Sequence, residues 1–436
     1  MIEMITSSIA GTAIGFIVGL VPGMGAVAAL VLCFPFLVKT SLAVTLIFYA
    51  SLIGASQYSG SISALLLGIP GENSSIPIIK LRNSLIKNDN VSEAITGTAL
   101  GSFIGSSLAL AVCIFILPLL SDVTFYMRTW ITVLMGISAL ILSVVFSDNK
   151  MWINLVLVVI GWILAKIGYD GVSNESFMTF GIDYLLGGLP SIAILMGLYT
   201  IPMMWKQWET KSSLSLISTH NLRFVSSIGN LITAVRSSAI GYLMGLVPYV
   251  GINASSGLAF YVEKYLNPND EVKQSIAAET SNNAATISVL IPLLLFGIAI
   301  QPSEAIVLEI MLSSNVLVNW QTVSVILPWL YLMILFSNLI SLILSFPLVD
   351  LISKLFLYVY KFLPYIITVF CMITIYLIGS QFSQPIYYFI CLFIFSGFGL
   401  IFRNIDMMPL IFSFLLQENL EYAIIRFSKI LISSIS

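Results

Sequence analysis

The sequence predicts an all-α membrane protein that crosses the bilayer many times. Of its 436 residues, 58% are apolar and only 9% are charged, whereas soluble domains carry about 25% charged residues. The charges are therefore too few to cover a globule in water. At about 20 apolar residues per span, the chain accommodates about 10 to 12 transmembrane helices. Helices are expected because backbone groups in lipid must form hydrogen bonds within their own segment.

The balance of charge excludes several classes of partner and activity. Lys and Arg number 18, Asp and Glu number 20, and one histidine is present, which gives a formal net charge of −2. Such a chain has no basic face for nucleic acid. It contains no Ser/His/Asp, Cys/His or HExxH arrangement, and a single histidine leaves little acid–base chemistry. We therefore expect a protein of the lipid bilayer that is not an enzyme and has no organic cofactor.

Basic residues indicate the orientation in the membrane. They gather in two loops, at Lys80, Arg82 and Lys87 and at Lys206, Lys211 and Arg223. Loops rich in Lys and Arg stay in the cytoplasm. The segment 168–184 carries three acidic residues and neither Lys nor Arg, so we expect it outside. These loops predict a multi-pass protein of the plasma (inner) membrane.

The most polar stretch divides the chain into two halves. Residues 206–225 are predicted to be a cytoplasmic linker between a first transmembrane repeat, 1–205, and a second, 226–436. The halves share a motif, because Ile14–Gly25 aligns without gaps to Ile240–Gly251 with seven of twelve positions identical. Chance similarity between glycine-rich membrane segments is the alternative. Internal duplication is typical of secondary transporters, often in inverted orientation, and we expect two inverted repeats.

Both copies of the motif break a membrane helix with Gly-x-x-Pro. Proline removes a backbone donor, and glycine lets the chain leave helical geometry. Broken helices or re-entrant hairpins persist at membrane depth only where protein or a water-filled cavity covers them. A half-helix N-terminus then offers N–H groups to an anion. Gly23 and Gly25 are therefore candidate substrate-binding residues, and a plain packing kink is the alternative.

Small hydroxyl residues occupy an otherwise apolar run that ends at Ile-Pro-Gly and Glu-Asn-Ser-Ser. This pattern predicts a helix, a tight turn and a second helix capped by Asn73, Ser74 or Ser75. On an unwound segment, two of the alternating serines would share a face. The alternative is helix packing through small residues. The candidate substrate-binding residues here are Tyr58, Ser59, Ser61, Gly71, Asn73 and Ser74.

In the second half, a carboxylate and two adjacent carboxamides lead into an apolar span. Polar groups at such a place are costly unless they are used. Helical spacing puts Asn282 and Asn283 beside Glu279. Asn282 and Asn283 are candidate substrate-binding residues, and Glu279, Asn283 and Thr286 are candidate cation-coupling residues. The alternative is an interfacial helix cap whose glutamate reaches the surface; the sequence does not identify a bound metal.

These motifs resemble those of the large membrane subunit (TctA type) of tripartite tricarboxylate transporters. The similar segments are Gly19–Gly25, Gln57–Gly71, Asp170–Gly181, Glu279–Ile298 and Gly399–Arg426. The sequence departs from the family pattern in three places. Ser59 replaces a glycine, Phe177 stands where an arginine is usual, and Ala299-Ile300 stand where the family has Pro-Gly.

The resemblance implies a secondary active transporter that takes up small carboxylates, tricarboxylates or dicarboxylates, by symport with Na⁺ or H⁺. In that family, a periplasmic or extracellular binding protein delivers the substrate, and a small four-span membrane subunit accompanies the large one. Neither partner is part of this sequence, so both are expected as separate chains. The alternative is a stand-alone carboxylate exporter or channel that works without partner subunits.

Overall fold

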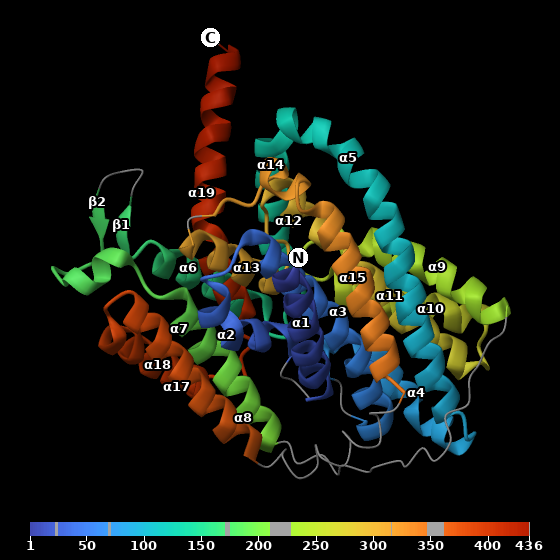
Figure 1. Cartoon of the computed structure of the whole chain (residues 1–436). Helices are drawn as coiled ribbons and strands as arrows, with labels where there is room; N and C mark the ends of the chain where they lie inside the picture. Colours follow the sequence, from blue (N-terminus) through green and yellow to red (C-terminus); the bar gives the residue numbers. More distant parts are fainter. Residues whose placement is uncertain are drawn as a thin grey trace.

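The computed structural model describes residues 1–21, 25–68, 71–170, 175–209, 228–314, 316–346 and 362–435. These residues are predominantly helical (Figure 1), as expected for an all-α membrane protein. The described part also contains one small β-hairpin, in which Gly168 lies opposite Phe177 and Asp170 opposite Glu175. This hairpin lies at the edge of the molecule (Figure 1) and does not interrupt the helical core.

The elements divide between the two halves of the chain. The elements of the first half are α1 (Ile2–Leu20), α2 (Gly25–Leu37), α3 (Leu42–Leu67), η1 (Asn73–Ser75), α4 (Ile76–Lys87), α5 (Val91–Phe146), α6 (Met151–Ala165), β1 (Gly168–Asp170), β2 (Glu175–Phe177), η2 (Asp183–Gly187), α7 (Ser191–Leu195), η3 (Met196–Thr200) and α8 (Ile201–Glu209). Those of the second half are α9 (Ile228–Gly245), α10 (Gly251–Leu266), α11 (Glu271–Ser288), α12 (Leu290–Phe296), α13 (Pro302–Ser313), α14 (Trp320–Ser324), α15 (Leu327–Leu344), α17 (Leu363–Gln381), α18 (Pro385–Ile401) and α19 (Met408–Ile435).

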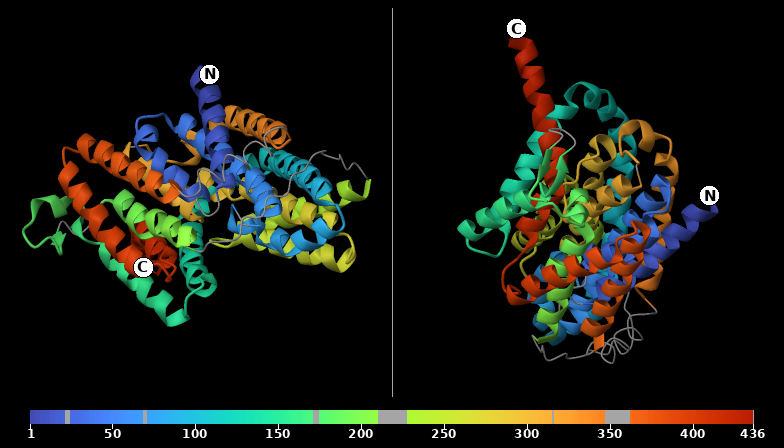
Figure 2. Two further views of the ribbon diagram at one scale, coloured as in Figure 1. Left: turned by 90° about the horizontal axis from the view of Figure 1, so that it is seen from below. Right: turned by 90° about the vertical axis from the view of Figure 1, so that its left-hand side faces the viewer.

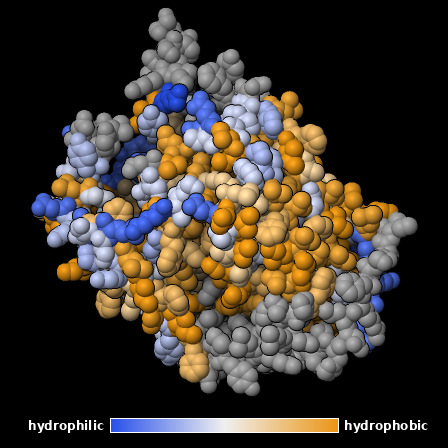
Figure 3. All heavy atoms as spheres, in the orientation of Figure 1, coloured by the Kyte–Doolittle hydropathy of each residue, from blue (hydrophilic) through white to orange (hydrophobic). Residues whose placement is uncertain are grey.

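Six helical segments of the described part are long and apolar enough to cross a membrane. They are Ile2–Leu20, Leu42–Leu66, Val91–Ser121, Thr129–Phe146, Leu327–Leu344 and Pro364–Gln381. Four shorter apolar segments accompany them: Gly25–Leu37, Met151–Ala165, Pro385–Ile401 and Met408–Glu418. Apolar side chains also cover much of the face in Figure 3. The protein is therefore a multi-pass membrane protein, as predicted.

The longest helix, α5, contains 56 residues and supplies two of these segments. It arches over one end of the molecule (Figure 1) and carries Pro118 inside the helix, which removes a backbone donor near the arch. Its first part packs on α9 and α11, and α5 also packs on α6 and α19. A single helix thus contacts both the helices α9 and α11 and the pair α6 and α19.

The helices fall into two groups (Figure 1, Figure 2). In the first, α1, α3, α5, α9, α10, α11 and α15 pack on one another. In the second, α17 and α18 pack beside α7, η3 and α8. Helices α2 and α13 lie in contact with each other, and α2 also touches α17. The first group contains α3 and α11, the two helices that carry the predicted binding residues Tyr58, Ser59, Ser61, Asn282 and Asn283.

Glycines allow the closest approaches within the first group. A Cβ atom on Gly15 of α1 would collide with the carbonyl of Leu52 in α3. In the same way, a Cβ atom on Gly241 of α9 would collide with the carbonyl of Ser281 in α11. Small residues at membrane helix interfaces let backbones meet in this way. The glycines of both motifs thus set the spacing between helices.

Both predicted helix breaks are present. Helix α1 ends at Leu20 and α2 begins at Gly25, while α9 ends at Gly245 and α10 begins at Gly251. The predicted binding residue Gly23 lies outside the described residues, as does most of the linker 206–225. Each break therefore lies where the shared motif has its proline.

Candidate functional site

The predicted tight turn follows α3, and we call its described residues, Gly68 and Gly71–Ser75, the first turn. Gly68 adopts a left-handed conformation (φ 71°, ψ 20°), which ends the helix. Arg82 of α4 donates from Nε to the Leu65 carbonyl (3.0 Å) and from Nη2 to the Leu66 carbonyl (3.1 Å). These bonds satisfy carbonyls that the helix end leaves without an intrahelical partner.

The first turn packs directly against the first helix break. Gly71 lies so close to Gly19 that a Cβ atom would collide with the Gly19 carbonyl. The Glu72 carboxylate accepts a hydrogen bond from the Ala26 N–H (2.9 Å), so it holds the N-terminus of α2. Gly25, with φ +57°, lies beside the same carboxylate. Gly25 and Gly71 are therefore required by backbone geometry, and Glu72 occupies the helix N-terminus.

Five buried polar side chains from both halves meet at the first turn, and we call Gln57, Ser74, Ser75, Glu279 and Asn282 the polar cluster. Ser74 Oγ and Asn282 Nδ2 each donate to Gln57 Oε1 at 2.7 Å. Ser75 Oγ donates to Glu279 Oε1 (3.0 Å), and Asn282 Nδ2 also donates to Glu279 Oε2 (3.3 Å). None of the five is more than 3% exposed. The structure thus brings the two predicted site segments into direct contact.

Helix α11 presents its two carboxamides to different neighbours. Asn282 faces α3, whereas Asn283 donates to Ser102 Oγ of α5 (2.8 Å) and to the Glu279 carbonyl (3.1 Å). The Thr286 hydroxyl donates to the Asn283 carbonyl (2.7 Å). In the described part of the chain, the Oδ1 atoms of Asn282 and Asn283 are buried without a hydrogen-bond partner. Buried acceptors of this kind are rare and are available to a ligand.

Helix α10 closes the other side of the first turn. Ser256 Oγ donates to the Ser74 carbonyl (2.6 Å), and Ser281 Oγ of α11 donates to the Ser255 carbonyl (3.0 Å). The first turn is therefore wedged between α3 of the first half and α10 and α11 of the second half. These contacts bury the polar cluster from that side as well.

The serines of α3 lie on a helix and not on an unwound segment, so the condition under which two of them would share a face is not met. Helix α3 is continuous through Leu67. Ser59 Oγ bonds to the Ala55 carbonyl (3.2 Å), and Ser61 Oγ bonds to the Tyr58 carbonyl (2.7 Å). A helical hydroxyl satisfied by its own backbone needs no other partner.

The remaining predicted residues of this segment lie in contrasting places. Tyr58 is buried inside α3, with 1% of its surface exposed. Asn73 is exposed at the start of η1 and lies outside the polar cluster. Ser75 precedes α4 as its N-cap residue but makes no side-chain capping bond, because its hydroxyl donates to Glu279.

The polar segment of α11 is not an interfacial helix cap. Asp270 caps this helix, because its side chain accepts from the Lys273 N–H (3.0 Å). Glu279 lies more than two turns further along the helix and is fully buried. The alternative of a glutamate that reaches the membrane surface is therefore wrong.

Three contributors to the site are absent from the predicted set. Gln57 is the only carboxamide in the apolar run 42–67, which is a signal that the sequence does carry. Glu72 directly follows the Pro-Gly pair of the predicted turn, so the sequence also carries a signal for this carboxylate. Ser102 is one of many small residues in α5, and only the packing of α5 on α11 distinguishes it.

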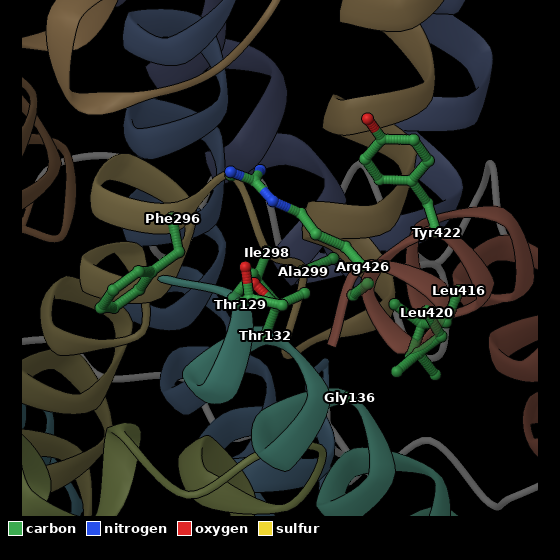
Figure 4. A pocket seen from close by; sticks show the side chains of 12 residues that line it. Thr129, Thr132, Gly136, Phe296, Ile298, Ala299, Leu416, Leu420, Tyr422 and Arg426 are labelled. Atoms are coloured by element: carbon green, nitrogen blue, oxygen red, sulfur yellow. The ribbon is translucent and has the colours of Figure 1, made fainter. Parts of the chain in front are cut away.

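A cavity of about 120 Å³ lies apart from the polar cluster, between α5, α19 and the end of α12. Figure 4 shows Arg426 extending from α19 above Ile298 and Ala299, with Thr129 and Thr132 of α5 close by. The described residues contain no group of three or more His, Cys, Asp or Glu that would hold a metal ion. The residues of the polar cluster are thus buried, whereas the cavity lies beside the end of α12.

Comparison with known proteins gives a family and two relatives. Residues 5–412 match the family described as Tripartite tricarboxylate transporter TctA family. A protein of Agrobacterium vitis, named an uncharacterized 52.8 kDa protein in the TAR-I ttuC' 3'region, is 26% identical over 438 residues, or 95% of this chain and 86% of that protein. The uncharacterized protein MJ1079 of Methanocaldococcus jannaschii is 24% identical over 388 residues, or 88% of this chain and 89% of that protein. No solved structure matches the chain.

Proposed function

Because the chain belongs to the tripartite tricarboxylate transporter TctA family and is a multi-pass membrane component of such a transporter, we propose that it takes up small carboxylates by symport with Na⁺ or H⁺. The substrate is a tricarboxylate or dicarboxylate. A periplasmic or extracellular binding protein and a small four-span membrane subunit act with it as separate chains in the plasma (inner) membrane.

The polar cluster is the observation that carries this proposal. Its donors are the Ser74 and Ser75 hydroxyls and the Asn282 amide, which now bond to Gln57 and Glu279. A substrate carboxylate offers the same kind of acceptor, so it replaces these internal partners when the first turn moves away from α10 and α11. Hydrogen bonds to a charged group are stronger than those to a neutral one, which favours the exchange at the neutral amide oxygen of Gln57.

A cation is needed because the site is acidic. The carboxylates of Glu72 and Glu279 lie close enough to interact electrostatically, and none of the cluster residues is Lys or Arg. A carboxylate substrate adds further negative charge, and buried charges are costly unless they are paired. We propose that the cation binds at Glu279 and at the Asn283 Oδ1 atom, beside Thr286.

Concentrative transport is the direct test. The purified chain is reconstituted in proteoliposomes with and without its two partner proteins, and uptake of labelled citrate and succinate is measured under Na⁺ and H⁺ gradients. Symport predicts accumulation above the external concentration that collapses when the gradient is dissipated. Equilibration without accumulation, whatever the gradient, would support the exporter or channel alternative instead.

Substitutions in α11 test where the substrate binds. Asn282→Ala and Asn283→Ala are expected to lower uptake at least about tenfold, because a hydrogen bond to a charged group contributes about 1.5–3 kcal/mol. Asn338→Ala is the matched control, since Asn338 is a buried carboxamide of α15 outside the polar cluster. Uptake at the wild-type rate in both α11 variants would refute this placement.

A further inference from the structure

The packing of α1 on α3 is repeated by the packing of α9 on α11. The two glycines of α1 recur in α9 after 226 positions, and the residues that they contact recur after 229. Gly15 and Gly19 meet the carbonyls of Leu52 and Ser56, and Gly241 and Gly245 meet those of Ser281 and Ala285. From Leu52 to Ser281, and from Ser56 to Ala285, the spacing is 229 positions. Equivalent backbone contacts therefore relate α3 to α11, although the two helices share little sequence.

The same spacing of 229 positions relates the first turn to a second one. Gly68 corresponds to Gly297, and both are left-handed, with φ 71° and φ 66°. Glu72 (φ −126°, ψ 151°) corresponds to Gln301 (φ −128°, ψ 152°). We call Gly297–Glu304 the second turn. Its backbone enters and leaves in the same conformation as the first turn, even though Ala299-Ile300 replace the family's Pro-Gly.

The two turns also occupy reciprocal places. The first turn contacts the second half, through Ser74 to Ser256 and Ser75 to Glu279. The second turn contacts the first half, because Ser303 Oγ lies 3.1 Å from the Tyr49 hydroxyl of α3. Helix α13, which begins in the second turn, packs on α2 and α3. Each repeat therefore places its turn against the broken helix pair of the other.

Glu304 stands in the second turn where the first turn has Ser75. It is fully buried. Its Oε2 atom accepts from the Ile300 N–H (2.7 Å) and from the Gln301 N–H (3.1 Å). Its Oε1 atom is buried without a hydrogen-bond partner among the described residues. The Tyr49 hydroxyl is near enough to interact electrostatically with this carboxylate.

Helix capping explains only half of this arrangement. A glutamate at the third position of a helix commonly bonds the backbone of the capping residue, which accounts for Oε2. A proton on Oε1 would create an O–H donor that has no acceptor in the described part of the chain. A negative charge would need a partner, and no Lys, Arg or His of the described residues forms an ion pair with Glu304. A cation bound at Oε1 would pair the negative charge and would make a proton there unnecessary.

We propose that Glu304 Oε1, together with the hydroxyls of Ser303 and Tyr49, binds a monovalent cation of the Na⁺ type at the second turn. All three ligands are hard oxygen atoms, which suit such an ion. A single carboxylate neutralises one positive charge, whereas a divalent ion would leave a buried excess charge. The site deepens the proposed function, because it adds an ion site that mirrors the one at the first turn.

Direct ion binding tests this site without any substrate. The purified chain is titrated with NaCl against choline chloride, and ²²Na⁺ binding and the unfolding temperature are recorded. Wild-type protein is expected to bind Na⁺ and to unfold at a higher temperature in its presence. Glu304→Gln and Tyr49→Phe are each expected to weaken Na⁺ binding at least about tenfold, since even supporting residues of ion sites have effects of this size.

Glu309→Gln is the matched control, because Glu309 lies on the same helix and its carboxylate accepts from Ser191 instead. Unchanged Na⁺ binding in Tyr49→Phe and in any folded Glu304→Gln protein overturns the proposal. An equal loss in Glu309→Gln, or stabilisation that follows pH and not Na⁺, also overturns it. If carboxylate uptake fails but Glu304→Gln alone removes Na⁺ binding, the second site stands and the transport proposal falls.

Discussion

At the scale of single residues, the polar cluster is defined by which atoms donate and which accept. Gln57 Oε1 receives two hydrogen bonds, and Glu279 receives the others. Gln57 and Glu279 are therefore the acceptors of the cluster, and its donors are Ser74, Ser75 and Asn282. Apart from the Asn282 Oδ1 atom, which is buried without a partner in the described part of the chain, these bonds lower the cost of burying the polar groups of the cluster.

Neutralising Glu279 separates binding from coupling. Glu279→Gln keeps the size of the side chain and removes its charge, so the substrate donors remain in place while the cation loses its carboxylate. We expect gradient-driven accumulation of carboxylate to fall at least about tenfold, while exchange of labelled for unlabelled substrate across the membrane persists. Parallel measurements of accumulation and exchange in the same proteoliposomes check this expectation.

Loss of exchange together with accumulation would instead assign Glu279 to the substrate. Glu263→Gln provides a matched control, because Glu263 is another buried carboxylate of the second half but pairs with Arg236. It is expected to leave the ratio of accumulation to exchange unchanged.

At the scale of elements, glycine contacts hold the helices that carry the site. Gly15 of α1 lies against the Leu52 backbone of α3, so a methyl group there must push the two helices apart. Helices that meet backbone to backbone leave no flexible side chain to absorb the change. The alignment of the first break with the first turn depends on this contact, because Gly19 lies one helical turn further along α1 and touches Gly71.

A pair of Gly→Ala substitutions tests the close packing of α1 on α3. Gly15→Ala is expected to destabilise the protein by about 1–3 kcal/mol, as overpacking does in other cores. Gly257→Ala in α10 is the control, because nothing lies within 4 Å of the added Cβ atom. It is expected to be neutral or to stabilise by up to about 1 kcal/mol, the difference in helix propensity. Unfolding temperatures in detergent compare the two, and equal values would contradict the close packing.

At the scale of the whole molecule, the two groups of helices suggest how access to the site changes. The first turn lies inside the group built on α1, α3, α5 and α11, while α7, α8, α17 and α18 form a separate group. Helices α2 and α13 link the groups through α17 and α19. The contacts of Ser74 with α3 and α10 lie within the first group, so a displacement that exposes the polar cluster must separate the first turn from α10 and α11 inside that group.

Accessibility of introduced cysteines tests the orientation of the whole chain. Ser176→Cys lies in the exposed strand β2 and is expected outside the cell, whereas Ser213→Cys lies in the predicted cytoplasmic linker, outside the described residues. A membrane-impermeant maleimide is expected to label Ser176→Cys in intact cells and Ser213→Cys only after permeabilisation. The wild-type chain is the background control, because three of its four cysteines are buried and the fourth is partly buried. The reverse pattern would invert the proposed topology.

Much of the helix pattern was predictable from local chemistry. Glycine and proline mark the ends of α1, α3 and α9, and the structure places helix ends at Leu20, Leu67 and Gly245. The polar segment of α11 was predicted as helical, with Glu279 beside Asn282, and this is confirmed. The serines of α3 lie on the predicted helix, which does not unwind, and the hydroxyls of Ser59 and Ser61 bond to its own backbone.

The sequence by itself determined that this is a multi-pass membrane protein and where its helices break, because composition and backbone-breaking residues act locally. Only the tertiary structure decided that Gln57 meets Asn282 across 225 positions and that Asn73 faces outward. It also decided that Glu304 lies buried opposite Tyr49. Such partners depend on how whole helices pack, and the packing is set by close backbone contacts that no single stretch of sequence specifies.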